Sequence, residues 1–118
     1  ISYRGSEGLG INTGGNVVGW KAVTTPPNGQ VVSVACKWLG STITLLEPTL
    51  SPNISSCAYA INAVNQIAGQ RTVNNVTKAY LWQNTGAMVD LGTLGGTKSK
   101  ATAINSLGAV VGSATDIY

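Results

Sequence analysis

Apolar and polar residues alternate along short stretches of this chain, and Asn and Gly interrupt the alternation at regular places. The clearest example is 101–113, where ATAI reads as one strand, NSLG as a turn and AVVGS as the return strand. Alternation with turn residues between the runs is typical of a β-hairpin. The pattern therefore predicts a chain of antiparallel strands joined by tight turns.

The same phrase occurs three times. INTGGNVVGW begins at residue 11, INAVNQIAGQ at 61 and INSLGAVVGS at 104, so the phrase recurs after 50 and then after 43 residues. In each copy a Gly closes the phrase seven positions after the Asn. A period of about 40–50 residues indicates a propeller blade or a related β-repeat array.

The Asn that opens each phrase and the fourth turn residue suit a three-residue hairpin loop. Asn can bond its side chain to the backbone further along the turn, and Gly or Asn accepts a left-handed backbone most readily. A type I turn followed by a left-handed residue is a common hairpin connection. We interpret these residues as turn-forming rather than ligand-binding: Asn12, Gly15, Asn62, Asn65, Asn105 and Gly108.

The segments between the hairpins repeat as well. VACKWLG at 34–40 corresponds to KAYLWQNTG at 78–86, and ITLLEPTLSPN at 43–53 corresponds to MVDLGTLGGT at 88–97. Each pair of segments can supply two more strands, so the expected fold is all-β, with repeated four-stranded antiparallel units that resemble propeller blades. We expect a single domain, 1–118, with repeats at about 8–57 and 58–100 and a partial repeat at 101–118.

Three tryptophans bear on function. Trp38 and Trp82 occupy matching positions, which favours core packing between repeats, whereas Trp20 has no match. The alternative is that the three indoles stack on sugar rings at sites between blades, as in a lectin-like propeller.

The charge content narrows the class of protein. Charged residues make up 9% of the chain and apolar residues 43%, so the chain should fold and its surface should be unusually poor in charge. This favours an extracellular or assembled protein. The net charge of +3 comes from scattered bases, which argues against nucleic-acid binding. No apolar run is long enough to predict a membrane span.

The sequence offers little for catalysis. It contains no histidine, which excludes a Ser-His-Asp or Cys-His catalytic site and argues against a zinc site. Glu47 takes a place roughly equivalent to that of Asp90, and no spacing among the acids suggests a paired-carboxylate site. GTLGGT at 92–97 lacks the GK[ST] of a phosphate loop. We therefore expect neither an enzyme nor a cofactor.

Cys36 and Cys57 are the two cysteines of the chain, and we predict a disulfide between them and hence an oxidising compartment. Two small buried thiols are the alternative. Asn53 and Asn75 open the sequons NIS and NVT, which are possible glycosylation sites on a surface protein.

Residues 79–113 resemble the extracellular HAF repeat, whose pattern runs from an aromatic "HAFLW" through "G-x-M-x-D-L-G-T-L-G-G" and "S-x-A-x-x-I-N" to "G-x-V-V-G". The first copy departs from it with LLEPTLSPN, and Lys78 stands before Ala79 where the family has its histidine. The resemblance implies a secreted or surface-exposed β-repeat protein, and it supplies no catalytic residues.

Two functions follow from these observations. The first is an extracellular structural protein whose incomplete repeats are completed by other copies of itself, as a filament, a surface layer or a ring. The low charge and the partial repeats at both ends favour it, and we expect the terminal strands, around 1–10 and 108–118, to pair or pack with other copies. The second is a glycan-binding module or a fragment of a longer secreted repeat protein, so glycans are possible partners.

Overall fold

The computed structural model describes residues 5–25, 29–84, 86–92 and 98–114, and these residues form three antiparallel sheets and no helix. Unit 1 contains β1 (Ser6–Ile11), β2 (Val17–Thr25), β3 (Gln30–Leu39) and β4 (Thr42–Leu45), paired in chain order. Unit 2 contains β5 (Ile54–Ile61), β6 (Ile67–Val73), β7 (Val76–Trp82) and β8 (Met88–Asp90) in the same order. Unit 3 contains β9 (Ser99–Ile104) and β10 (Val110–Ala114). The predicted all-β fold with four-stranded antiparallel sheets is confirmed.

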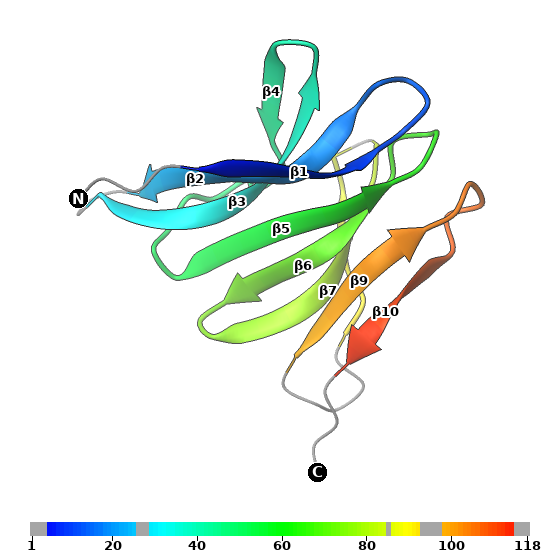
Figure 1. Cartoon of the computed structure of the whole chain (residues 1–118). Helices are drawn as coiled ribbons and strands as arrows, with labels where there is room; N and C mark the ends of the chain where they lie inside the picture. The colour runs from blue at the N-terminus through cyan, green and yellow to red at the C-terminus, as the bar shows by residue number, and fades with distance from the viewer. Residues whose placement is uncertain (1–4, 26–28, 85, 93–97, 115–118) are drawn as a thin grey trace.

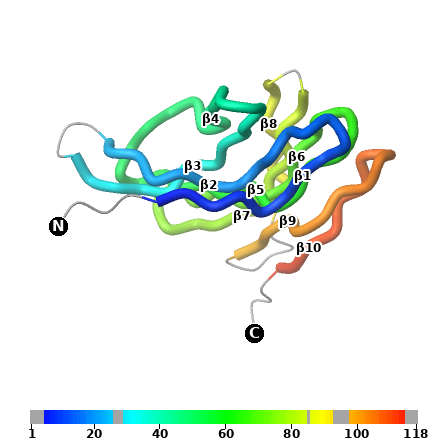
Figure 2. The backbone as a smooth tube through the Cα atoms, turned by 45° about the horizontal axis from the view of Figure 1, so that its top comes forward, coloured from blue at the N-terminus to red at the C-terminus, as the bar shows by residue number. Residues whose placement is uncertain are grey.

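The three units follow one another side by side in a flat molecule of 43 × 42 × 22 Å (Figure 1). The first strand of each unit lies against the preceding sheet: β5 contacts β1, β2 and β3, and β9 contacts β5, β6 and β7 (Figure 2). The described sheets do not close into a barrel or a ring. Residues 1–4 and 115–118, which the assembly hypothesis includes, lie outside the described residues.

The core lies in the two joints between units rather than within any one sheet. At joint 1/2, Val18 and Ala35 of unit 1 pack against residues of unit 2 that include Ile61 and Trp82. At joint 2/3, Ala68 and Ala79 of unit 2 pack against Ala101, with Ile104 and Val110 at the margin. A single sheet buries its apolar face only against another element, so each unit depends on its neighbour for stability.

The expected repeat boundaries cut through strands. The boundary expected at 57/58 falls inside β5 and the one at 100/101 inside β9.

Candidate assembly interface

The three Asn-Gly phrases form the first hairpin of each unit, with the turn expected from the sequence. In unit 1 the amide of Gly15 donates to the carbonyl of Asn12 at 3.1 Å, and Asn12 pairs with Asn16 to close a three-residue loop. Units 2 and 3 repeat these bonds. The fourth turn residue has a left-handed backbone in each copy, with φ of 82° at Gly15, 64° at Asn65 and 86° at Gly108.

The opening Asn also holds its own turn through its side chain. The Oδ1 atom of Asn62 accepts from the amides of Val64 at 3.2 Å and Gln66 at 2.9 Å. Asn12 and Asn105 accept from the corresponding amides of their turns. One amide oxygen therefore satisfies two backbone donors that the tight loop leaves free.

The other end of the same side chain joins neighbouring units. Nδ2 of Asn12 donates to the carbonyl of Asn62 at 3.0 Å and to Oδ1 of Asn65 at 2.7 Å. Nδ2 of Asn62 donates to the carbonyl of Asn105 at 3.0 Å and to Oε1 of Gln66 at 2.7 Å. The turn-forming role expected of these residues is therefore only part of what they do, because Asn12 and Asn62 also bond to the turn of the following unit.

A serine makes the second recurring bond across the joints. The amide of Ala35 in β3 donates to Oγ of Ser56 in β5 at 2.8 Å, and the amide of Ala79 in β7 donates to Oγ of Ser99 in β9 at 2.7 Å. These amides lie where the short fourth strand has ended, so they lack a strand partner on that side. Each serine stands six positions before the Asn of its unit, as Ser6 does in unit 1. The sequence contained this signal, and the serine was not identified from it.

The Gly that closes each phrase is required for a steric reason, which was not recognised from the sequence. The first strand of each unit carries a β-bulge, between Gly8 and Gly10 in β1 and between Ala58 and Ala60 in β5. A Cβ at Gly19, Gly69 or Gly112 would come far closer than 3.0 Å to a backbone carbonyl of that bulged strand. Any side chain there would displace the first strand, so the position requires Gly.

Equivalent apolar residues differ in exposure according to whether a neighbouring unit is present. Ile61, which faces unit 1, is 8% exposed, whereas the equivalent Ile11 is 68% exposed. Val18 and Ala68 are fully buried by the unit that follows them, whereas the equivalent Val111 is 63% exposed. Unit 1 therefore presents an uncovered face with Ile11, and unit 3 presents an uncovered face with Val111.

Asn105 marks the uncovered face of unit 3. Its Oδ1 accepts from Leu107 and Ala109 within its own turn, and the side chain is exposed. Within the described part of the chain its Nδ2 makes no hydrogen bond, whereas Asn12 and Asn62 use this group to reach the next unit. Asn105 thus presents its side-chain Nδ2 donor at the position from which Asn12 and Asn62 bond to the following unit.

A buried ion pair adds to joint 1/2. Arg71 of β6 donates from Nε and Nη2 to the two carboxylate oxygens of Glu47, both at 2.7 Å, and the Glu47 side chain is fully buried. The hydrogen bond to Glu47 is the main cause of a raised Arg71 pKa, so the guanidinium stays charged. The guanidinium also lies 5.6 Å from the centre of the Tyr80 ring.

The expected equivalence of Glu47 and Asp90 is wrong. Leu45 pairs with Cys36 as Asp90 pairs with Tyr80, so Leu45 is the counterpart of Asp90. Asp90 instead forms an exposed 3.2 Å ion pair with Lys78. The two carboxylates therefore serve separate structural pairs.

The predicted disulfide between Cys36 and Cys57 is wrong, because both residues are free thiols. Ser56 directs its side chain to β3, and successive side chains of a strand point to opposite faces, so Cys57 points away from the strand that carries Cys36. Burial raises the pKa of Cys36 to about 11 and also raises the pKa of Cys57.

The three tryptophans lie in different surroundings. Trp38 and Trp82 do occupy equivalent positions, opposite Val17 and Ile67 in their sheets. Trp82 belongs to the core of joint 1/2 and is 2% exposed, and its Nε1 is buried with no hydrogen-bond partner among the described atoms. Trp20 donates from Nε1 to Glu7 at 3.0 Å. The buried face of Trp82 is closed to a sugar ring.

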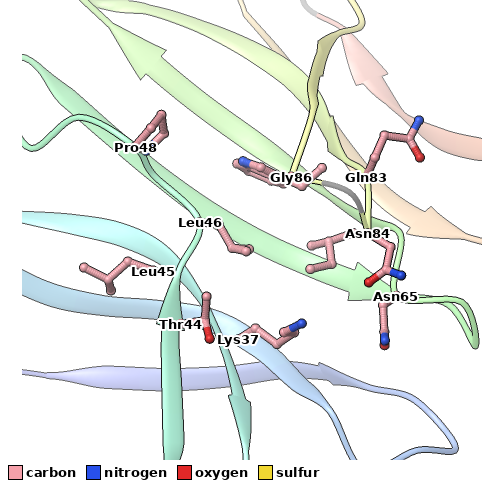
Figure 3. Close-up of a pocket in the computed structure, with 11 residues that line it drawn as sticks. Lys37, Thr44, Leu45, Leu46, Pro48, Asn65, Gln83, Asn84 and Gly86 are labelled. Atoms are coloured by element: carbon pink, nitrogen blue, oxygen red, sulfur yellow. The ribbon is translucent and has the colours of Figure 1, made fainter.

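A cavity of about 250 Å³ lies between the outer parts of units 1 and 2. Figure 3 shows Lys37 of β3 directed toward Asn65 and Asn84, which come from two turns of unit 2, with Leu46 and Pro48 on the opposite wall. Oδ1 of Asn65 accepts the bond from Asn12, so its Nδ2 is left as a donor at this cavity. The wall is polar on one side and apolar on the other.

The two sequon asparagines lie together on the surface. Asn53 precedes β5, Asn75 lies in the turn between β6 and β7, and both are exposed. The carbonyl of Asn53 accepts from the amide of Asn74 at 3.0 Å, which holds the two sites at the same end of unit 2.

The described part of the chain contains no apolar helix long enough to cross a membrane and no group of three or more potential metal ligands. Comparison with protein-family models, with curated proteins and with solved structures found no match for this chain.

Proposed function

We propose that this protein is an extracellular structural subunit that assembles head to tail, with the uncovered face of unit 1 packed on the uncovered face of unit 3 of another copy. The observation that carries the proposal is the exposure of Ile11 and Val111, whose equivalents are buried at the internal joints. Two exposed apolar faces on opposite sides of a flat molecule are an unfavourable arrangement for an isolated chain.

The internal joints give the expected contacts. Ile61 meets the surface around Val18, and Nδ2 of Asn62 reaches the carbonyl of Asn105. By the same geometry, Ile11 of one copy packs near Val111 of the next, and Asn105 donates to the carbonyl of Asn12. A heterologous contact of this kind forms a ring if the rotation closes and a filament if it does not.

The proposal also includes a propeller-blade-like arrangement of the units and an extracellular location for the protein. Four-stranded units placed side by side, each with its first strand against the preceding sheet, support a propeller-blade-like array and the HAF-repeat resemblance of residues 79–113. The low charge of 9% supports an extracellular location. The free thiols remove the disulfide as an argument for it.

The test is particle size. The unaltered chain, measured by light scattering coupled to gel filtration over a wide concentration range, is expected to form multimers. Ile11→Asp and Val111→Asp should each give monomers, because a carboxylate on either face opposes the apolar contact. Val76→Asp is the matched control, since Val76 is 45% exposed on unit 2, away from both uncovered faces.

Two further arms make the result decisive. An equimolar mixture of Ile11→Asp and Val111→Asp has one intact contact and should form dimers but no larger species. A monomeric wild-type chain at high concentration, with circular dichroism typical of a folded β-protein, would overturn the proposal.

Glycan binding is the second candidate. The cavity between units 1 and 2 supports it, because Lys37, Asn65 and Asn84 offer donors beside an apolar wall. Trp82 also lines this cavity, but at 2% exposed it offers little of the stacking surface expected from the sequence. Screening a glycan array with wild type and Lys37→Ala tests this function, and binding that is equal in both would contradict a site in this cavity.

A further inference from the structure

Among the described residues, the second strand of unit 3 pairs on one side only, whereas the second strand of each other unit also pairs with a third strand. β2 pairs with β3 and β6 pairs with β7, whereas the described residues pair β10 with β9 alone. An unpaired strand edge exposes a row of backbone donors and acceptors that can bind another extended chain.

A groove of about 260 Å³ runs beside this edge. Its apolar wall comes from both sides of joint 2/3, with Ala79 and Leu91 from unit 2 and Ala101, Val110 and Gly112 from unit 3. The groove therefore lies between two sheets, next to the strand edge, rather than on the outer face that we assign to head-to-tail contact.

Joint 1/2 shows what fills the same place when a third strand is present. The equivalent residues around that joint include Ala35, Ala58 and Ile67, and the indole of Trp82 from β7 packs among them. Trp82 pairs with Ile67, and a Cβ at Gly69 would lie 2.9 Å from Cζ3 of this ring. The absence of a side chain at Gly69 makes room for the indole, and Gly112 provides the same space in unit 3.

We propose that the β10 edge binds an extended strand of a partner polypeptide, antiparallel to β10, with a tryptophan opposite Val110 whose indole fills this groove. Backbone hydrogen bonds along β10 supply affinity, and the indole supplies specificity, as in other complexes formed by strand addition. The inference goes beyond the proposed function, because it concerns the edge of unit 3 and requires no second copy of the chain.

The chain supplies the probe for this test. A peptide with the sequence of residues 76–84, VTKAYLWQN, carries the third-strand pattern of unit 2. Its affinity for the full chain is measured by isothermal titration calorimetry, beside a peptide in which Ala replaces the tryptophan. The native peptide should bind with a 1:1 stoichiometry, and loss of the indole should weaken binding by about tenfold or more.

Variants of the protein locate the site. Val110→Asp should weaken binding of the native peptide by a similar factor, whereas Leu107→Asp, at a highly exposed turn position outside the groove, should change affinity less than twofold. Hydrogen exchange should show new protection of the β10 amides on peptide addition. Because the tryptophan-free peptide is tested on the unaltered protein, a folding defect in Val110→Asp does not obscure the result.

Two results would overturn the inference: no saturable binding of the native peptide, or equal affinity for the tryptophan-free peptide. Light scattering in the presence of peptide separates this test from that of the proposed function. A monomeric chain that binds the peptide overturns the assembly and retains the strand site, whereas a multimer that ignores the peptide does the reverse.

Discussion

Asn62 donates from its side-chain Nδ2 to the backbone carbonyl of Asn105, 43 positions later, at 3.0 Å. The same amide accepts from two backbone donors in its own turn. A single buried side chain thus determines the shape of one hairpin and the position of the next.

Replacing Asn62 tests this double role. Asn62→Ala should lower the free energy of unfolding by about 2–4 kcal/mol, because it leaves buried backbone groups without partners. The measurement is urea denaturation followed by circular dichroism. Asn105→Ala is the matched control, measured at a concentration where the chain is monomeric: within one chain it removes the turn bonds alone, so its cost should be about 1 kcal/mol. Equal effects in the two variants would show that the bond across the joint contributes nothing.

The closing Gly of the repeated phrase gives a second prediction. Gly69→Ala should destabilise the protein by about 3 kcal/mol or more, because the added methyl group meets both a carbonyl of β5 and the Trp82 ring. Gly14→Ala, where the added Cβ finds only ordinary contacts at 3.5 Å, should change stability by less than about 1 kcal/mol. Thermal unfolding of both variants measures the difference, and a stable Gly69→Ala protein would contradict the assigned packing.

The Glu47–Arg71 pair should be worth far more than the Lys78–Asp90 pair. Glu47→Gln leaves a largely buried guanidinium without its counter-ion and should cost about 2–4 kcal/mol. Asp90→Asn breaks an exposed pair and should cost less than about 1 kcal/mol. Chemical denaturation at low and high salt checks this, since the cost of Asp90→Asn alone should shrink further as salt screens the exposed charges.

The cysteines give a prediction about pH. The folded state raises the pKa of Cys36 from 9.0 to about 11, so the fold favours the neutral thiol. Its contribution to stability is fully present below pH 9 and is lost as the pH rises toward 11, because the unfolded chain releases the proton first. Unfolding measured from pH 7 to 11 should show a shallower decline in Cys36→Ala than in the unaltered protein.

Reactivity and mass test the same thiols. In the native protein at pH 8, iodoacetamide should modify the half-buried Cys57 before the fully buried Cys36. Both should react after denaturation without reductant. A two-dalton mass gain on reduction of the native protein would contradict the free thiols.

Local chemistry explains what could be predicted from the sequence. The hairpins were recognisable because Asn and Gly act on the backbone of their own turn, and the left-handed positions at Gly15, Asn65 and Gly108 depend on those residues alone. The match of Trp38 with Trp82 followed from the repeat itself.

The features that were missed involve contacts between units. The Nδ2 bonds join residues about 50 positions apart, and nothing in one phrase shows that its Asn reaches the next. The disulfide was misjudged because spacing along the chain does not tell which face of β5 carries Cys57. Glu47 was misaligned because it was matched to Asp90 by residue type, whereas pairing within the sheet decides equivalence.

The serine and asparagine of each first hairpin have a consequence for how such a chain can change in length. Both bonds of a joint are formed by groups that every unit carries: an acceptor serine toward the unit before it and a donor asparagine toward the unit after it. A duplicated segment of 43 or 50 residues therefore arrives with a compatible surface on each side, without a second mutation to match it. Unequal recombination can add or remove such segments, and the number of units becomes a freely adjustable trait while the joint between them stays the same.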